Sequence, residues 1–67
     1  MYKQVKQALK ENGELMIMVA DGRKFELHLH NVKFDDASQT IFIDGAKELY
    51  WINGEQILYY WIHKAVE

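Results

Sequence analysis

Four dipeptides of Asn or Asp followed by Gly divide this 67-residue chain, and they constrain its fold more than any other feature. They are Asn12-Gly13, Asp21-Gly22, Asp44-Gly45 and Asn53-Gly54. Such dipeptides supply the positive φ angles that helix C-caps and tight hairpin turns require. The stretch Asp35–Ser38 predicts a fifth turn, and the chain contains no proline. We therefore expect short elements of secondary structure joined by tight turns.

The segment before the first of these turns has helical periodicity. Tyr2, Val5 and Leu9 lie on one face of a helix, and three lysines lie on another. Because Asn12-Gly13 is a typical helix end, we predict a helix over about residues 2–11.

After this helix the apolar residues alternate, which is typical of β-strands. Phe25, Leu27 and Leu29 point to one side of the second predicted strand, whereas Val32 has the opposite parity. This change of phase predicts a bulge or bend near His30-Asn31. The five expected strands cover about residues 14–20, 23–34, 39–43, 47–52 and 55–63. Short turns make neighbours in the chain antiparallel, so the sheet is expected to be a meander whose edges are closed or covered.

Residues 55–66 fit two interpretations. The run from Ile57 to Ile62 is rich in aromatic and β-branched residues, which favours a strand. The same segment also fits a helical face, and Asn53 with Gln56 would form a capping box. We prefer the strand and keep the helix as the alternative. The whole of residues 1–67 is then expected to form a single domain.

The composition argues against several classes of protein. The chain has no cysteine, which excludes disulfides and thiolate metal sites and fits a reducing compartment. It has no run of about 20 apolar residues and no apolar segment after its N-terminal lysines, so we expect a cytoplasmic protein that does not bind membranes. Domains of this size commonly need a metal, a disulfide or a partner subunit, and oligomerisation is the expected solution here.

The charge is unevenly distributed. The net charge is −2, which argues against nucleic acid, but residues 1–13 contain Lys3, Lys6 and Lys10 against Glu11. This end of the chain could hold a polyanion, because electrostatic contacts are local in physiological salt. The lysine stripe is therefore a candidate phosphate-binding surface, and the alternative is a solvated helix face.

The order of a helix followed by strands resembles the Sm-like family, which includes Sm proteins and the bacterial host factor Hfq. Leu15–Ile43 is similar to the family's first motif, with a strand, an Asp-Gly turn, a long bent strand and a further strand. Trp51–Ile57 is similar to the second motif, although Asn53 stands where that motif has a basic residue. The glycine usual in the middle of the family's second strand is also absent, with Glu26 or Leu27 near its place.

This resemblance implies a mainly β protein with one N-terminal α-helix, folded as a small five-stranded antiparallel SH3-like barrel. It implies a homo-oligomeric ring, with five to seven subunits favoured, that binds single-stranded RNA and serves RNA metabolism or riboregulation. The residues implied in RNA binding are Lys3, Lys6, Lys10, Asp35, Gln39, Thr40, Asn53 and Gly54.

Aromatic residues occupy both faces of the last two predicted strands. They are Tyr50, Trp51, Tyr59, Tyr60 and Trp61. A single small core cannot bury both faces, so these residues are predicted to form a subunit interface, as the last two strands do in Sm-like rings. Two alternatives are a barrel that closes around one face and base stacking on the aromatic rings. The alternative function is a non-enzymatic protein-interaction module, a dimeric or oligomeric adaptor or inhibitor.

No catalytic constellation is found in the sequence. His28 and His30 share a strand face and would offer a metal two ligands, with His63 or a carboxylate as a third. The spacing requires no third ligand, and we prefer the interpretation that they are polar residues on the solvent face of an alternating strand. The aspartates lie in turn sequences, where their side chains bond to nearby backbone. We therefore expect no enzyme activity, no metal and no cofactor.

Overall fold

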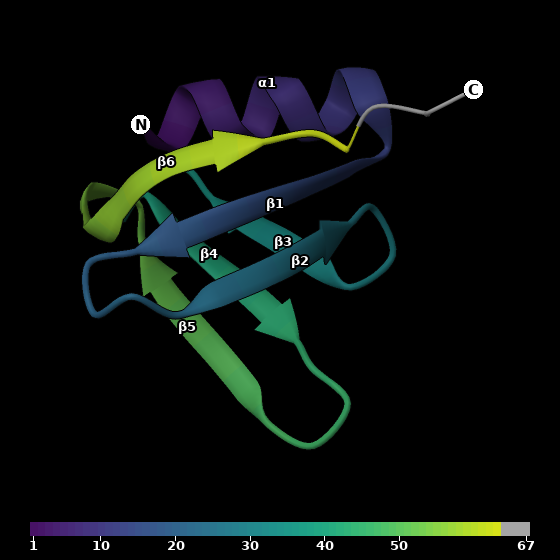
Figure 1. Ribbon diagram of the computed structural model, residues 1–67. Helices are drawn as coiled ribbons and strands as arrows, with labels where there is room; N and C mark the ends of the chain where they lie inside the picture. Colours follow the sequence, from purple (N-terminus) through teal and green to yellow (C-terminus); the bar gives the residue numbers. More distant parts are fainter. Residues whose placement is uncertain (64–67) are drawn as a thin grey trace.

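The computed structural model describes residues 1–63 as one helix and six strands in two antiparallel sheets (Figure 1). The elements are α1 (Tyr2–Asn12), β1 (Glu14–Val19), β2 (Lys24–His28), β3 (Val32–Asp35), β4 (Thr40–Asp44), β5 (Leu49–Asn53), the 3₁₀-helix η1 (Gly54–Gln56) and β6 (Ile57–Trp61). One sheet has the order β2-β1-β6 and the other β3-β4-β5. The prediction of a mainly β chain with an N-terminal helix is confirmed, and the closed barrel stays a prediction.

The helix ends where the sequence predicts. Gly13 has a φ of 79°, in the left-handed region that favours glycine, and its N–H donates to the Leu9 carbonyl at 2.8 Å. Tyr2, Val5 and Leu9 are buried, as their spacing indicates. The lysines of α1 consequently face away from the core.

The prediction of one strand over residues 23–34 is wrong. The chain leaves β2 after His28 and turns before β3, so the two halves belong to different sheets. The Asn31 side chain holds this turn, because its Oδ1 accepts the His28 N–H at 2.8 Å. Leu29, which the alternation places inward, is 61% exposed. The predicted bend near His30-Asn31 is therefore a full interruption of the strand.

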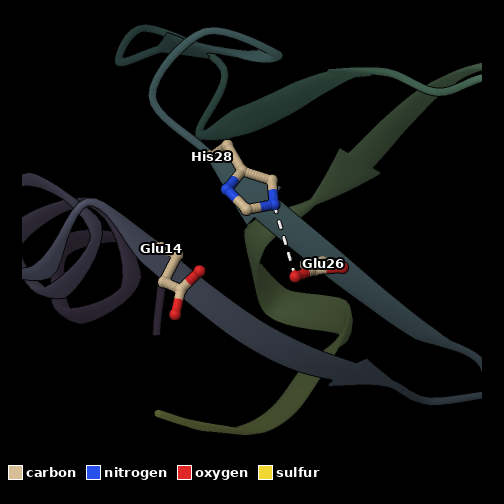
Figure 2. A group of neighbouring side chains, drawn as sticks. All are labelled: Glu14, Glu26 and His28. Atoms are coloured by element: carbon tan, nitrogen blue, oxygen red, sulfur yellow. Dashed lines mark ion pairs between the residues drawn. The ribbon is translucent and has the colours of Figure 1, made fainter. Parts of the chain in front are cut away.

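The β1–β2 hairpin fixes one charged outer face. Glu14 lies opposite His28 in the antiparallel register, and Glu26 lies two residues before His28 on the same strand. Figure 2 shows that these three side chains lie close together on the two strands. The turn of this hairpin contains Gly22, whose φ is 90°, as the Asp21-Gly22 dipeptide predicts.

The last segment is a strand, but it begins later than predicted. Residues 54–56 form η1, and Asn53 caps it by accepting the Glu55 N–H at 2.9 Å. β6 pairs with β1, with Ile17 opposite Tyr60, so the expected meander of chain neighbours is wrong at this strand. The part of the predicted helix alternative beyond residue 63, up to residue 66, lies outside the described residues.

The apolar side chains of α1 and of the inner faces of both sheets form one core. α1 lies beside β6 at one end of the molecule, and β3, β4 and β5 lie behind the first sheet in the view of Figure 1. The core residues are Tyr2, Val5, Leu9, Leu15, Ile17, Val19, Leu27, Ile41, Ile43, Ile52 and Ile57. Burial of this apolar surface is the main force that stabilises the fold. Within residues 1–63 no helix has both the length and the apolar character needed to cross a membrane.

Candidate nucleic-acid interface

An open cleft of about 460 Å³ lies between α1 and the turn that joins β3 to β4. Its lining residues are Tyr2, Lys3, Lys6, Gln7, Lys10, Asp36 and Gln39. The three lysines reach the same cleft because residues three, four and seven positions apart share one side of a helix. Four of the residues predicted to bind RNA, the three lysines and Gln39, are thus brought together.

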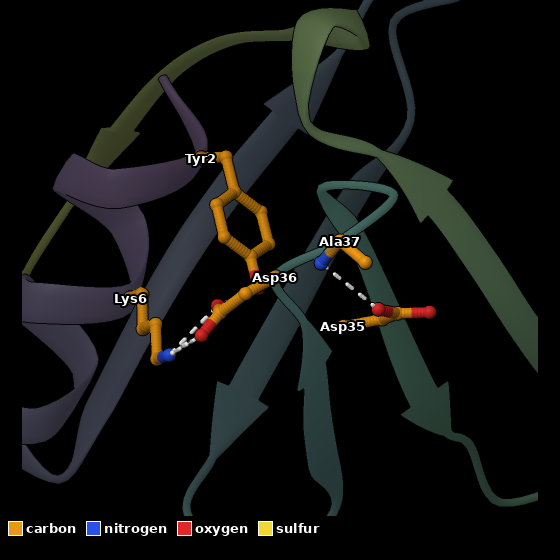
Figure 3. Close-up of polar contacts among 5 residues, drawn as sticks. All are labelled: Tyr2, Lys6, Asp35, Asp36 and Ala37. Carbon is orange, nitrogen blue, oxygen red and sulfur yellow. Dashed lines mark hydrogen bonds and ion pairs between the residues drawn. The ribbon is translucent and has the colours of Figure 1, made fainter.

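Asp36 joins the β3–β4 turn to α1 (Figure 3). The Tyr2 hydroxyl donates to Asp36 Oδ1 at 2.6 Å. Lys6 Nζ donates to the two carboxylate oxygens of Asp36 at 2.8 and 2.9 Å. Asp36 was not among the predicted site residues, because the sequence places it in a turn and gives no sign that the turn meets the helix. Lys6 is consequently neutralised, whereas Lys3 and Lys10 make no ion pair within residues 1–63.

These contacts set the protonation states at one end of the cleft. The hydrogen bond from Lys6, followed by that from Tyr2, holds the pKa of the Asp36 carboxyl below its usual range. Burial, followed by the hydrogen bond to Asp36, raises the pKa of Tyr2 to about 12. At neutral pH the tyrosine is therefore a neutral donor, the aspartate an anion and Lys6 its counterion.

The β3–β4 turn is ordered by its own side chains. Asp35 Oδ1 accepts the Ala37 N–H at 3.1 Å (Figure 3), and Ser38 Oγ donates to Thr40 Oγ1 at 3.0 Å. Gln39 has a φ of 55°, which is uncommon for a residue other than glycine. This conformation carries the chain from the turn into β4, with Gln39 at the cleft.

The two loops implied in RNA binding lie next to each other. Thr40 pairs with Asn53 in the β4–β5 register, and the Gly54 N–H donates to the Gln39 carbonyl at 2.9 Å. A Cβ on Gly54 would lie 2.6 Å from Tyr2 Cβ and 3.1 Å from the Gln39 oxygen, so only glycine fits between them. Gly54 therefore allows η1, the β3–β4 turn and α1 to meet at one point.

The remaining predicted RNA-binding residues lie outside the cleft. Asp35 and Thr40 border a neighbouring depression of about 260 Å³ that also contains Phe42 and Trp51. Asn53 borders a third depression beside the β1–β2 turn, and Gly54 is buried. The structure thus divides the predicted set between the lysine cleft and two adjoining surfaces.

The predicted interface residues also divide into two groups. Tyr50 and Tyr60 are partly buried and pack against the core. Trp51 and Tyr59 are 66% and 47% exposed, and their rings lie 5.1 Å from Phe42 and 5.4 Å from Trp61, measured between centroids. Phe42 was missed because the sequence places it within an ordinary β-branched strand. Trp51 on β5 and Tyr59 on β6 are therefore the exposed aromatic residues, and each lies against one half-buried ring.

Two sheet edges carry these aromatic residues. Within the described chain, β5 pairs only with β4, and β6 pairs only with β1. Each strand leaves one row of backbone N–H and C=O groups without a strand partner, which is a template for pairing with another chain.

Comparisons of this chain with protein-family models, with curated proteins and with solved structures give no significant match.

Proposed function

We propose that this protein is an Sm-like domain that forms a homo-oligomeric ring and binds single-stranded RNA in the cleft beside α1. The observation that carries the proposal is the cleft itself, in which three lysines and the side chains of Gln7 and Gln39 face one open volume. Lysines supply the charge that phosphates need, and carboxamides supply donors and acceptors for bases or riboses. The two loops that the family resemblance implicates adjoin this cleft.

The path of the chain supports an Sm-like barrel. β2 and β3 are the two halves of the predicted bent strand, and they pass from one sheet to the other through the turn held by Asn31. Strands that change sheets at a bend are how orthogonal β structures make their corners. β6 returns to pair with β1, so the last strand lies beside the first.

The ring is supported by the edges at β5 and β6, which are two of the four edge strands in the described chain. Pairing of β5 in one subunit with β6 in the next would satisfy both rows of backbone groups and would bring Trp51 and Tyr59 toward a neighbouring subunit. A repeated head-to-tail contact of this type closes into a ring when the rotation angle between neighbouring subunits divides 360° evenly. Five to seven subunits are the number that the family resemblance favours.

The RNA proposal is tested by fluorescence anisotropy with uridine-rich and adenine-rich oligonucleotides. If Lys3 and Lys10, which make no ion pair within residues 1–63, each contact one phosphate, a fourfold rise in salt is expected to weaken binding by roughly sevenfold. Lys10→Gln, which removes a cleft charge that makes no ion pair in the described chain, is expected to weaken binding at low salt and to reduce the salt dependence.

Lys47→Gln is the matched control, because Lys47 lies in the loop between β4 and β5. Figure 1 shows this loop at the opposite end of the molecule from α1. The substitution removes the same charge from the protein without touching the cleft. Equal losses in the two variants would indicate only a general charge effect. Absence of binding by either oligonucleotide at low salt would exclude the RNA proposal.

If neither oligonucleotide binds, the second candidate function is a protein-interaction module, and the exposed apolar residues favour it. The large apolar residues that are exposed on β5, β6 and the segment after it are Leu49, Trp51, Leu58, Tyr59 and Ile62. Exposed apolar surface of this kind marks protein contacts, whether with another copy or with a different protein. A small adaptor or inhibitor would use this surface and leave the lysine cleft in solvent.

A further inference from the structure

Three side chains with metal-binding atoms converge on the outer face of the β1–β2 hairpin (Figure 2). Glu14, Glu26 and His28 each offer one donor atom, and these atoms all lie within 4.8 Å of one another. His28 Nε2 lies 3.3 Å from Glu26 Oε1. This face is separate from the lysine cleft, which none of the three residues lines.

The hairpin register holds these three residues together. Glu14 is the direct cross-strand partner of His28, and Glu26 and His28 are two residues apart on β2, so all three project from the same side. Directly opposed side chains in an antiparallel pair have Cβ atoms about 5 Å apart. The donors are therefore positioned by backbone hydrogen bonds rather than by a mobile loop.

No lysine or arginine of the described chain balances the two carboxylates at this site. Glu14 and Glu26 are diagonal neighbours of like charge, and neither makes an ion pair with a lysine or arginine within residues 1–63. Lys24 projects from the same side of β2, but its cross-strand partner is Met18, and within residues 1–63 it makes no ion pair with either carboxylate. A divalent cation would neutralise both carboxylates and remove their mutual repulsion.

The donor set favours a particular ion. We propose that Glu14, Glu26 and His28 form a Zn²⁺ site. Zinc lies about 2.0–2.2 Å from imidazole nitrogen and carboxylate oxygen, so two ligands of a tetrahedral site are about 3.4 Å apart, close to the spacing between Glu26 and His28. Mg²⁺ and Ca²⁺ prefer sites with oxygen ligands alone, so the imidazole nitrogen of this site argues against both ions.

A further histidine lies near this site, outside the three converging donors. His63 borders the same small depression as Glu14 and Glu26, where the chain follows β6. His30 has a different place, because its ring stacks on that of His28 with centroids 5.4 Å apart. The sequence pairs His28 with His30 as ligands, whereas the structure makes His30 a neighbour that supports the ring of His28.

The test is a titration of chelator-treated protein with Zn²⁺, monitored by isothermal titration calorimetry and by ¹H–¹⁵N NMR spectra. One Zn²⁺ per chain is expected to bind, with shifts confined to β1, β2 and residues near His63. His28→Gln and Glu26→Gln are each expected to weaken binding by more than about tenfold, because loss of a ligand costs at least as much as loss of an outer-shell partner. His63→Gln is expected to weaken binding less.

Glu48→Gln is the matched control for Glu26→Gln, since it removes a carboxylate of the β4–β5 loop that is outside the donor set. It is expected to keep most of the zinc affinity. The proposal is overturned if Zn²⁺ gives no saturable shifts on this face, if His28→Gln binds like the unchanged protein, or if Mg²⁺ and Ca²⁺ compete equally. RNA binding by the cleft is measured separately and is not expected to change in these variants.

Discussion

At the scale of single residues, Tyr2 links the core to the candidate site. Its side chain is buried, and it makes a T-shaped contact with Phe34 at 5.8 Å between ring centroids. Its hydroxyl reaches the surface and donates to Asp36. The same residue therefore contributes to the packing of α1 and fixes the carboxylate that neutralises Lys6.

Tyr2 is expected to make stability depend on pH in the alkaline range. Folding raises its pKa from 10.0 to about 12, so the unfolded chain loses this proton first. The contribution of Tyr2 to the free energy of unfolding is thus fully present below about pH 10 and is lost as the pH rises toward 12. Urea unfolding at a series of pH values, followed by tryptophan fluorescence, measures this loss.

Tyr2→Phe is the comparison for that experiment. At neutral pH it is expected to lower the free energy of unfolding by about 1 kcal/mol, the typical net value of one hydrogen bond. Between pH 10 and 12 it is expected to lose less stability than the unchanged protein. Parallel loss in both proteins would show that Tyr2 does not titrate as the structure indicates. Tyr59→Phe, at an exposed tyrosine, controls for loss of a hydroxyl.

At the scale of elements, the decisive contact is the meeting of α1, the β3–β4 turn and η1 at Gly54. Any side chain at this position would push against Tyr2 Cβ and the Gln39 carbonyl, both of which are held by their own elements. The backbone of Gly54 has no positive φ, so space rather than conformation requires glycine here.

Gly54→Ala is therefore expected to destabilise the protein by about 1–3 kcal/mol, the usual cost of overpacking. It is also expected to loosen α1, seen as faster amide exchange at Val5, whose N–H bonds to the Met1 carbonyl. Gly22→Ala is the useful contrast, because a Cβ there meets no atom and strains only the φ of 90°. Faster exchange in α1 for Gly22→Ala but not for Gly54→Ala would contradict the proposed contact.

At the scale of the whole molecule, the open edges and the exposed aromatic residues make the same prediction. We expect light scattering on the tag-free protein to give a particle of about 40–56 kDa, which is five to seven copies of the 8.0 kDa chain. Tyr59→Glu is expected to reduce the mass to that of the monomer while far-ultraviolet circular dichroism stays unchanged. The reason is that Tyr59 is 47% exposed, so a charge there opposes pairing without entering the core.

Leu29→Glu provides the control for that variant. Leu29 is 61% exposed and lies between β2 and β3, which are the edge strands opposite β6 and β5 in the two sheets. It is expected to keep the assembly intact. A monomeric mass for the unchanged protein would remove the ring, and a dimer would favour the protein-interaction module.

Local signals determined much of this fold. The helix, its end at Gly13 and the first hairpin turn follow from periodicity and turn chemistry, which act over a few neighbouring residues. The last strand is favoured only by its aromatic and β-branched residues, because its periodicity also fits a helix. The lysine stripe followed in the same way, since helical spacing alone puts Lys3, Lys6 and Lys10 together.

Only the tertiary structure decided which distant segments meet. Three contacts join residues from different elements: the pairing of β6 with β1, the ion pair between Lys6 and Asp36, and the convergence of Glu14 on Glu26 and His28. The full break of the strand after His28 likewise places β2 and β3 in different sheets. Periodicity reports which face of an element is apolar, but it carries no information on which element covers that face. The physical reason is that such contacts are selected by packing of the common core, in which every element takes part at once.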